Sequence, residues 1–260
     1  MAKAIFFDVD GTLFRVSCRV PQSTVRAIEA CAKNGHIILL CTGRNQSMIP
    51  EEVRALPLSG MVGGCGTYVA LKDRILTDAY VEGEDCKRIV AALYKYCCPF
   101  YIENSDYFYY DPDYITDSFL GPVASMNKNY PAYVRHMDSF PNRIAKITAY
   151  PEKREYVPDL IRELSPWFDV ITHPEYDYIE ITLKGYSKGT GVQQLIDALG
   201  LKREDTYGFG DSRNDIPMLE TVGHGIVMGD APDELKKCYQ ATDSMFADGI
   251  EKGLKKAGLI

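Results

Sequence analysis

The clearest indication of fold and function lies near the start of the chain, in Ala4-Ile5-Phe6-Phe7-Asp8-Val9-Asp10-Gly11-Thr12. The four apolar residues are typical of a β-strand that is buried on both faces of a sheet. Gly11 would let the backbone turn sharply, so that the two acids can face one cavity. Two carboxylates this close repel, and they share a proton, bind a cation or face water. The alternative is a solvent-exposed turn without a function, because Asp-x-Asp-Gly is also common in loops. The position of the two acids directly after a buried strand favours a functional site.

The next segment predicts a βαβ unit, and therefore a parallel sheet. Residues 23–34 have the apolar spacing of an amphipathic helix, with Ser23 or Thr24 as the expected N-cap. Residues 37–41 form a second apolar run of the length of a buried strand. Strand, helix and strand within about forty residues indicate parallel pairing. A third strand at 61–62 and a hairpin over 68–76 are expected to follow.

The same alternation returns from residue 187 onward. A helical stripe there ends at Gly200, which suits the position just after a helix. The remaining expected core elements are strands at 206–209 and 225–228 and helices that start near Pro217 and Pro232.

The middle of the chain has a different pattern of apolar residues. Helical stripes run over 86–97 and 157–164, whereas residues 111–141 show no clear pattern. Strand-like pieces lie at 100–103, 107–110, 144–150, 170–172 and 178–182. This block is typical of an α+β unit with an antiparallel sheet. We therefore predict an α/β fold: a doubly wound, Rossmann-like parallel sheet core from residues 1–79 and 184–260, with an α+β cap inserted at 80–183.

The composition argues against several classes of protein: nucleic-acid-binding, membrane-bound and secreted. The chain has 260 residues, of which 29 are Lys or Arg and 36 are Asp or Glu, for a net charge of −7. This negative charge disfavours nucleic acids and anionic membranes as partners, since both bind proteins through positively charged surfaces. An acid at position 8 interrupts any secretory apolar region, and no window reaches the roughly 20 apolar residues of a membrane span. Eight cysteines without a C-x-x-C pair favour reduced thiols over disulfides or zinc, so a cytoplasmic protein is expected.

Polar clusters follow three of the predicted core strands, at 8–12, 42–44 and 211–215. Ligands of open α/β sheets bind outside the carboxyl ends of the strands. If these strands are neighbours, their clusters lie within side-chain reach of one another. That convergence carries the functional prediction.

Asp211 and Asp215 are four residues apart, which places both on one side of a helix that starts near Ser212. Capping of the helix dipole would explain one of these acids but not both. Together with Asp8 and Asp10 they make four carboxylates at strand ends. Such a set calls for a hard cation, and Mg²⁺ is the natural occupant.

Thr42-Gly43 offers a hydroxyl and an unhindered backbone N–H at a strand end, and both can donate to a phosphate. Turns of this kind are also common without a ligand. Arg44 could be a phosphate fork or a solvated cation at a helix start. Lys188, where the chain re-enters the predicted core, would by itself be taken for a surface residue.

Four stretches, in this order, resemble the motifs of the haloacid dehalogenase superfamily: Asp8-Val9-Asp10-Gly11-Thr12-Leu13, Leu40-Cys41-Thr42-Gly43-Arg44, Ser187-Lys188-Gly189 and Gly208-Phe209-Gly210-Asp211-Ser212-Arg213-Asn214-Asp215. With the insertion in mid-chain, the whole chain is similar to the Cof-type sugar-phosphatase branch, which carries an α/β cap. It departs from that branch after the third strand, where Gly63-Gly64-Cys65-Gly66-Thr67 stands in place of Asn-Gly.

The resemblance implies a phosphatase that works through an aspartyl-phosphate. In it, Asp8 is the nucleophile, and Asp10 is the acid that protonates the leaving alcohol and later the base that activates water. Asp8, Asp211 and the backbone carbonyl of Asp10 form the Mg²⁺ site, which Asp215 orients. A general acid at Asp10 also argues against dehalogenation, because a halide leaves without a proton.

The resemblance also assigns the groups that hold phosphate. Thr42 and Lys188 supply a hydroxyl and an ammonium, and Asn214 is a further phosphate contact. With Gly43 and Arg44 from the residue analysis, they complete the expected phosphate-binding set. The expected partner is a small phosphorylated metabolite, most simply a sugar phosphate, and the protein is expected to be a monomer or homodimer.

Two alternatives stay open. A phosphomutase would pass the phosphoryl group to a sugar hydroxyl rather than to water. A non-enzymatic phospho-acceptor module would be regulated at Asp8, although receiver domains of this kind lack a cap insertion. Within the cap, seven aromatic residues between 100 and 114 favour packing of its sheet over a stacking platform for sugar rings. The cap histidines, His136 and His173, are given no role.

Overall fold

The computed structural model describes residues 2–15, 18–172 and 177–260. It divides into two compact units. The core unit comprises Met1–Arg44, Ile49–Asp78 and Tyr186–Ile260, and the insert unit comprises Asn45–Met48 and Ala79–Gly185. His173 lies outside the described residues.

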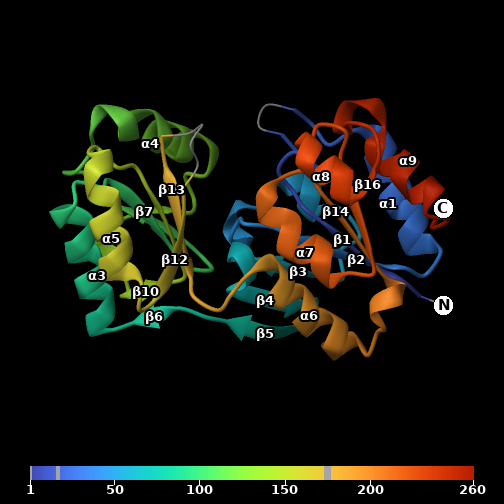
Figure 1. Cartoon of the computed structure of the whole chain (residues 1–260), viewed down its shortest axis with the longest axis horizontal. Coiled ribbons are helices and arrows are strands. Elements are labelled where there is room, and N and C mark those ends of the chain that lie inside the picture. The colour runs from blue at the N-terminus through green and yellow to red at the C-terminus, as the bar shows by residue number, and fades with distance from the viewer. Residues whose placement is uncertain (1, 16–17, 173–176) are drawn as a thin grey trace. The chain divides into compact units, whose positions relative to one another are not determined.

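The core unit is built on an eight-stranded sheet in the order β16-β15-β14-β1-β2-β3-β4-β5 (Figure 1). Strand β1 pairs in parallel with β2 on one side and with β14 on the other, and β3 pairs in parallel with β2. Strand β4 pairs antiparallel with both β3 and β5. The bounds are β1 Ala4–Phe7, β2 Ile37–Cys41, β3 Gly60–Gly63, β4 Tyr68–Leu71, β5 Arg74–Asp78, β14 Thr206–Gly210, β15 His224–Val227 and β16 Gln240–Ala241. The predicted parallel core with a hairpin beyond its third strand is confirmed.

Helices cover both faces of this sheet. Along β1, Ile5 and Phe7 point to one helical layer and Ala4 and Phe6 to the other, because successive strand residues face opposite sides. All four side chains are fully buried, as expected of a strand without a polar residue. The first layer contains α1 Gln22–Lys33, α2 Glu51–Arg54 and α9 Gly249–Lys256; the second contains α6 Lys188–Leu199, α7 Ile216–Thr221 and α8 Asp233–Cys238. The α/β class is confirmed.

The ends of two core helices test the capping predictions. Gly200 follows α6 in the left-handed conformation, with φ of 63°, as predicted. The predicted N-cap of α1 is wrong. Pro21 precedes the first helical residue with φ of −56° and ψ of 138°, so Ser23 and Thr24 lie buried inside the first turn instead. A proline, which has a fixed φ and no N–H to satisfy, replaces a side-chain cap here.

The insert unit contains a six-stranded sheet in the order β12-β13-β11-β7-β8-β9 and a two-stranded pair of β10 with β6. The bounds are β6 Val81–Glu82, β7 Phe100–Glu103, β8 Phe108–Tyr110, β9 Val134–His136, β10 Arg143–Ile144, β11 Lys146–Ala149, β12 Phe168–Thr172 and β13 Ile179–Leu183. Its helices are α3 Glu84–Lys95, α4 Asp117–Asn129 and α5 Val157–Leu164.

The expectation of a purely antiparallel sheet in this unit is wrong at one place. Strands β8 and β9 pair in parallel, and α4 connects them, so the stretch without a clear pattern is a βαβ unit. The helix was hidden because it contains Pro122 and buries only Phe119 and Val123. Its flanking strands have three residues each, too few to show a period.

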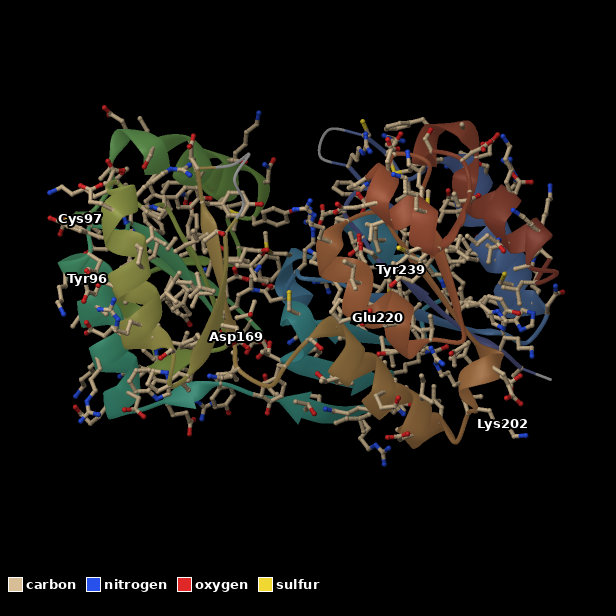
Figure 2. All side chains as sticks on the ribbon, viewed as in Figure 1. Tyr96, Cys97, Asp169, Lys202, Glu220 and Tyr239 are labelled. Carbon is tan, nitrogen blue, oxygen red and sulfur yellow. The ribbon has the colours of Figure 1, made fainter. Side chains whose placement is uncertain are left out.

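Several aromatic residues of the insert unit pack in its interior. Tyr101, Phe108 and Tyr110 form one buried cluster with Phe119 and Val123 of α4. For these residues the prediction that they pack the sheet, rather than form a platform on which sugar rings stack, is confirmed. The predicted stripe over 86–97 overruns its helix. Cys97 lies beyond the end of α3 with φ of 53° (Figure 2).

Across the described ranges, no helix combines the length and the apolar character needed to cross a membrane.

Candidate active site

The polar loops that follow the central strands β1 and β14 lie next to each other. Strands β1 and β14 are parallel neighbours, and the N–H of Asp8 donates to the carbonyl of Phe209 at 2.9 Å. After β1 the chain builds the sheet toward β2, and β14 continues it on the opposite side. This reversal is the topological switch point at which open α/β sheets bind ligands. The residues after β1 and after β14 therefore lie together at the carboxyl ends of the strands.

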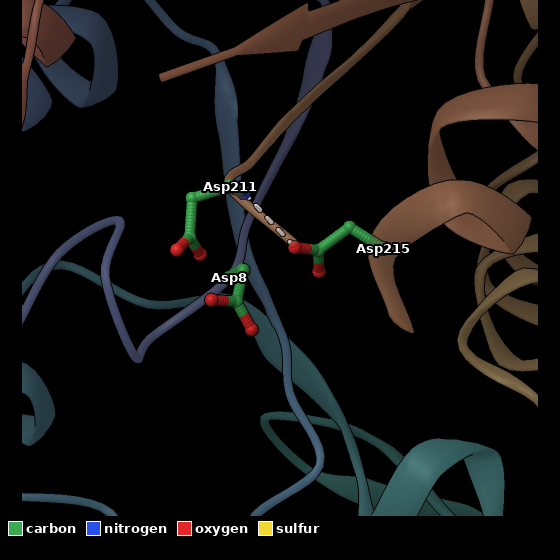
Figure 3. Close-up of side chains that lie close together, drawn as sticks. All are labelled: Asp8, Asp211 and Asp215. Atoms are coloured by element: carbon green, nitrogen blue, oxygen red, sulfur yellow. Dashed lines mark hydrogen bonds between the residues drawn. The ribbon is translucent and has the colours of Figure 1, made fainter. Parts of the chain in front are cut away.

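Three acids meet at this edge. Asp8, Asp211 and Asp215 each present a carboxylate oxygen, and these oxygens lie within 4.8 Å of one another (Figure 3). Asp8 and Asp215 are buried, and Asp211 is half-buried. Gly11 makes room for the third acid. Its φ is +84°, and a Cβ there would lie 2.2 Å from a carboxylate oxygen of Asp211.

Asp215 is held from several sides. Its Oδ2 accepts from the backbone N–H groups of Asp211 and Ser212, both at 3.0 Å, and its Oδ1 accepts from Lys188 at 2.5 Å. It closes the 3-10 turn Arg213–Asp215, for which Ser212 is the N-cap. With its oxygens engaged in this way, Asp215 is placed to orient the loop that carries Asp211.

Lys188 is the first residue of α6, yet its side chain is only 1% exposed. Its ammonium donates to Oδ1 of Asp8 at 2.7 Å, to Oδ1 of Asn214 at 2.9 Å and to Asp215. Nothing in the local sequence distinguishes it from a surface lysine. The tertiary fold turns it inward, where it is the cation that faces two buried acids.

Burial and like charge dominate the electrostatics of the cluster. Burial, reinforced by the Asp215 carboxylate, raises the pKa of Asp8 well above its ordinary value, although Lys188 opposes the shift. The same two causes raise the pKa of Asp211 to about 7. Burial disfavours the charge on Lys188, but the Asp215 and Asp8 carboxylates outweigh it and hold the pKa of Lys188 well above the usual range.

These acids fit a magnesium ion. All of the clustered donors are carboxylate oxygens, which Mg²⁺ prefers, and burial together with their mutual repulsion raises the pKa of Asp8 and Asp211. A divalent cation would offset that repulsion. Asp8 and Asp211 are the side chains that would hold it.

The raised pKa of Asp211 predicts a stability that depends on pH. Between its unfolded pKa of about 4 and its folded pKa of about 7, the folded apoprotein binds a proton that the unfolded chain releases. The contribution of Asp211 to the free energy of unfolding therefore falls as the pH rises through this range. Because Mg²⁺ competes with that proton, adding it should raise Tm more at about pH 8 than at about pH 6.

Differential scanning fluorimetry in EDTA, and then in excess Mg²⁺, measures both effects. Asp211→Asn is the matched variant, and it should lose most of the response to Mg²⁺. An equal rise in Tm at both pH values for the wild-type protein would contradict the proton competition.

The other predicted site residues lie on the loops after β1 and β2. Thr42 is buried, and its Oγ1 accepts from the N–H of Arg44 at 3.1 Å. A Cβ on Gly43 would lie 3.3 Å from Sγ of Cys65. Asp10 is exposed, and both of its carboxylate oxygens accept from the Arg44 guanidinium at 2.6 Å. Asp10 therefore stands apart from the acid cluster, and the fork of Arg44 is engaged by an acid.

Two hydroxyls of the site were not predicted. Thr12 donates to Oδ1 of Asp211 at 3.4 Å, and Ser212 donates to Oδ1 of Asn214 at 2.9 Å. Both occur inside stretches that the sequence singles out. No local pattern, however, shows which acid or amide each hydroxyl meets.

The family described as haloacid dehalogenase-like hydrolase matches residues 5–254. Among similar proteins, HMP-PP phosphatase of Yersinia enterocolitica is 27% identical over 91% of this chain and 87% of its own length. The 5-amino-6-(5-phospho-D-ribitylamino)uracil phosphatase YitU of Bacillus subtilis is 25% identical over 97% of this chain and 96% of its own. The solved structure of the HAD subclass IIB sugar phosphatase BT4131 has 25% identity and a TM-score of 0.81, and the match covers both chains completely.

Proposed function

This chain belongs to the haloacid dehalogenase-like hydrolase family, and from that premise we propose a magnesium-dependent phosphatase that acts through an aspartyl-phosphate on small phosphorylated metabolites, in the first place sugar phosphates. One observation carries the proposal: Asp8 and Asp211, from opposite ends of the chain, present carboxylate oxygens within 4.8 Å of each other, with the Lys188 ammonium on Asp8. This arrangement supports Asp8 as the nucleophile, Asp8 and Asp211 as cation ligands and Lys188 as a fixed positive charge.

In the first half-reaction, Asp8 attacks phosphorus and the bond from phosphorus to the ester oxygen breaks. Asp10 donates its proton to the departing alcohol oxygen. A phosphate monoester dianion repels a carboxylate, so the attack requires positive charge near both groups. Lys188 supplies one such charge and keeps Asp8 oriented through the bond to its Oδ1.

Asp8, Asp211 and the backbone carbonyl of Asp10 would hold Mg²⁺, while Asp215 holds the Asp211 loop in place through the N–H of Asp211. When bound, the ion neutralises charge on the phosphate and on the acids and acts as a Lewis acid. Thr42, Gly43 and Asn214 are proposed to donate to the phosphate oxygens, alongside Lys188.

In the second half-reaction, Asp10 accepts a proton from water as the water attacks phosphorus. The bond from phosphorus to Asp8 breaks, which restores the carboxylate and releases inorganic phosphate. Asp10 thus returns to the protonated state in which it began.

We assign substrate selection to the inserted domain, residues 80–183, as the resemblance to cap-bearing sugar phosphatases implies. The named relatives act on different phosphorylated small molecules, so a sugar phosphate is a proposal about this chain. A cytoplasmic location is proposed as well, because the spacing of the eight cysteines favours reduced thiols over a disulfide framework.

Hydrolysis of para-nitrophenyl phosphate and of a panel of phosphorylated metabolites tests the function. We expect release of inorganic phosphate, a loss of at least about a hundredfold on addition of EDTA, and recovery with Mg²⁺. A hexose phosphate that is isomerised without release of phosphate would make the protein a mutase. A phosphorylated Asp8 that persists for hours without turnover of any monoester would make it a phospho-acceptor module.

A further inference from the structure

Asp10 and Arg44 form a two-point ion pair in the core unit. The Nε of Arg44 donates to Oδ2 of Asp10 and its Nη2 donates to Oδ1, both at 2.6 Å. This is the planar fork that arginine offers a carboxylate and lysine cannot. The Arg44 side chain is 10% exposed, whereas that of Asp10 is 51% exposed.

Other contacts with described residues of the core unit also hold Arg44 in place. Its guanidinium lies over the ring of Phe14, 5.6 Å from the ring centre. Its backbone N–H donates to Oγ1 of Thr42, and its carbonyl accepts from the N–H of Gly64 at 2.8 Å. The fork therefore presents a fixed surface to Asp10.

The ring beneath the guanidinium belongs to the same turn as Asp10. The N–H of Gly11 donates to the carbonyl of Phe14 at 2.9 Å, and the N–H of Phe14 donates to the carbonyl of Val9 at 2.8 Å. The loop after β1 thus meets Arg44 twice, through a carboxylate and through an aromatic face.

We propose that Arg44 is a positioning residue for Asp10 rather than a phosphate ligand, an inference that rests on the proposed function. An exposed aspartate samples several rotamers, and proton transfer needs one of them. The fork selects a single orientation. Each carboxylate oxygen has a second lone pair, on which Asp10 would carry the proton that it passes to the leaving group and regains from water, while both oxygens still accept from the fork.

The test compares Arg44→Ala on two substrates: para-nitrophenyl phosphate, whose leaving group needs little protonation, and the best alkyl phosphate of the wild-type protein. We expect kcat for the alkyl phosphate to fall roughly 10- to 100-fold with KM within about twofold, and kcat for the aryl phosphate to fall less. Arg44→Lys keeps the charge without the fork and should recover only part of the loss. An equal loss on both substrates, a raised KM with weaker inhibition by inorganic phosphate, or full recovery by lysine would overturn the proposal.

A double-mutant cycle separates action through Asp10 from any other role. In the Asp10→Asn background, Arg44→Ala should cost almost nothing further, and an additive loss would refute the inference. Arg143→Ala is the matched control, because Arg143 pairs with Glu82 at 3.0 Å and lies over Tyr80 in the insert unit. A wild-type protein inactive on every monoester would defeat the proposed function itself, whereas an active one with additive losses would defeat only the role of Arg44.

Discussion

Asp8→Asn is expected to lower the hydrolysis of every phosphate monoester by roughly four orders of magnitude or more, because an amide cannot form the acyl-phosphate bond. The variant should remain folded. Asparagine has the shape of aspartate, and its Oδ1 can still accept from the Lys188 ammonium, which keeps its bond to Asp215. The measurements are kcat/KM with para-nitrophenyl phosphate and Tm in EDTA.

Two further measurements make this expectation specific. Acid quenching of the wild-type protein with labelled substrate should trap phosphate on the chain, and Asp8→Asn should trap none. Asp169→Asn, an exposed aspartate on β12, is the matched control and should behave as the wild type does. Residual activity of Asp8→Asn above a few per cent would remove Asp8 from the role of nucleophile.

Lys188→Met is expected to damage stability and activity together. The substitution leaves Asp8 and Asp215 buried without the ammonium that bonds both. Breaking a buried ion pair from one side costs about 3–5 kcal/mol, which for a chain of this size lowers Tm by roughly 10 °C. Activity should fall at least about a hundredfold, because the positive charge beside the nucleophile is lost.

The loss of stability can be traced to the stranded charges. Adding Asp215→Asn to Lys188→Met should restore part of the Tm measured in EDTA, since one of the two unpaired carboxylates is then gone. Lys3→Met is the control, because Lys3 pairs with Asp205 nearer the surface and surface pairs contribute little. A double variant no more stable than Lys188→Met would show that the lysine supports the fold by packing alone.

The local order of residues determined the strands, the helices and the ends of the strands that carry polar groups. Strand β2 lies at the residues of its apolar run, and Gly200 ends α6 as predicted. These features depend on neighbours within a few residues, so their periods and turn residues are visible in one dimension. Where that signal is weak, as in α4 with its internal proline, the prediction failed.

Only the tertiary structure decided which side chains meet. The position of Lys188 between Asp8 and Asp215, and the pairing of Arg44 with Asp10, join residues 27 to 180 positions apart. No local period encodes such contacts, because they depend on the order of strands in the sheet and on the paths of the loops beyond them. Burial then sets the charge balance of the acids, and burial is a property of the folded chain. The sequence by itself thus determined which residues could carry the chemistry, and the fold decided which of them act on one another.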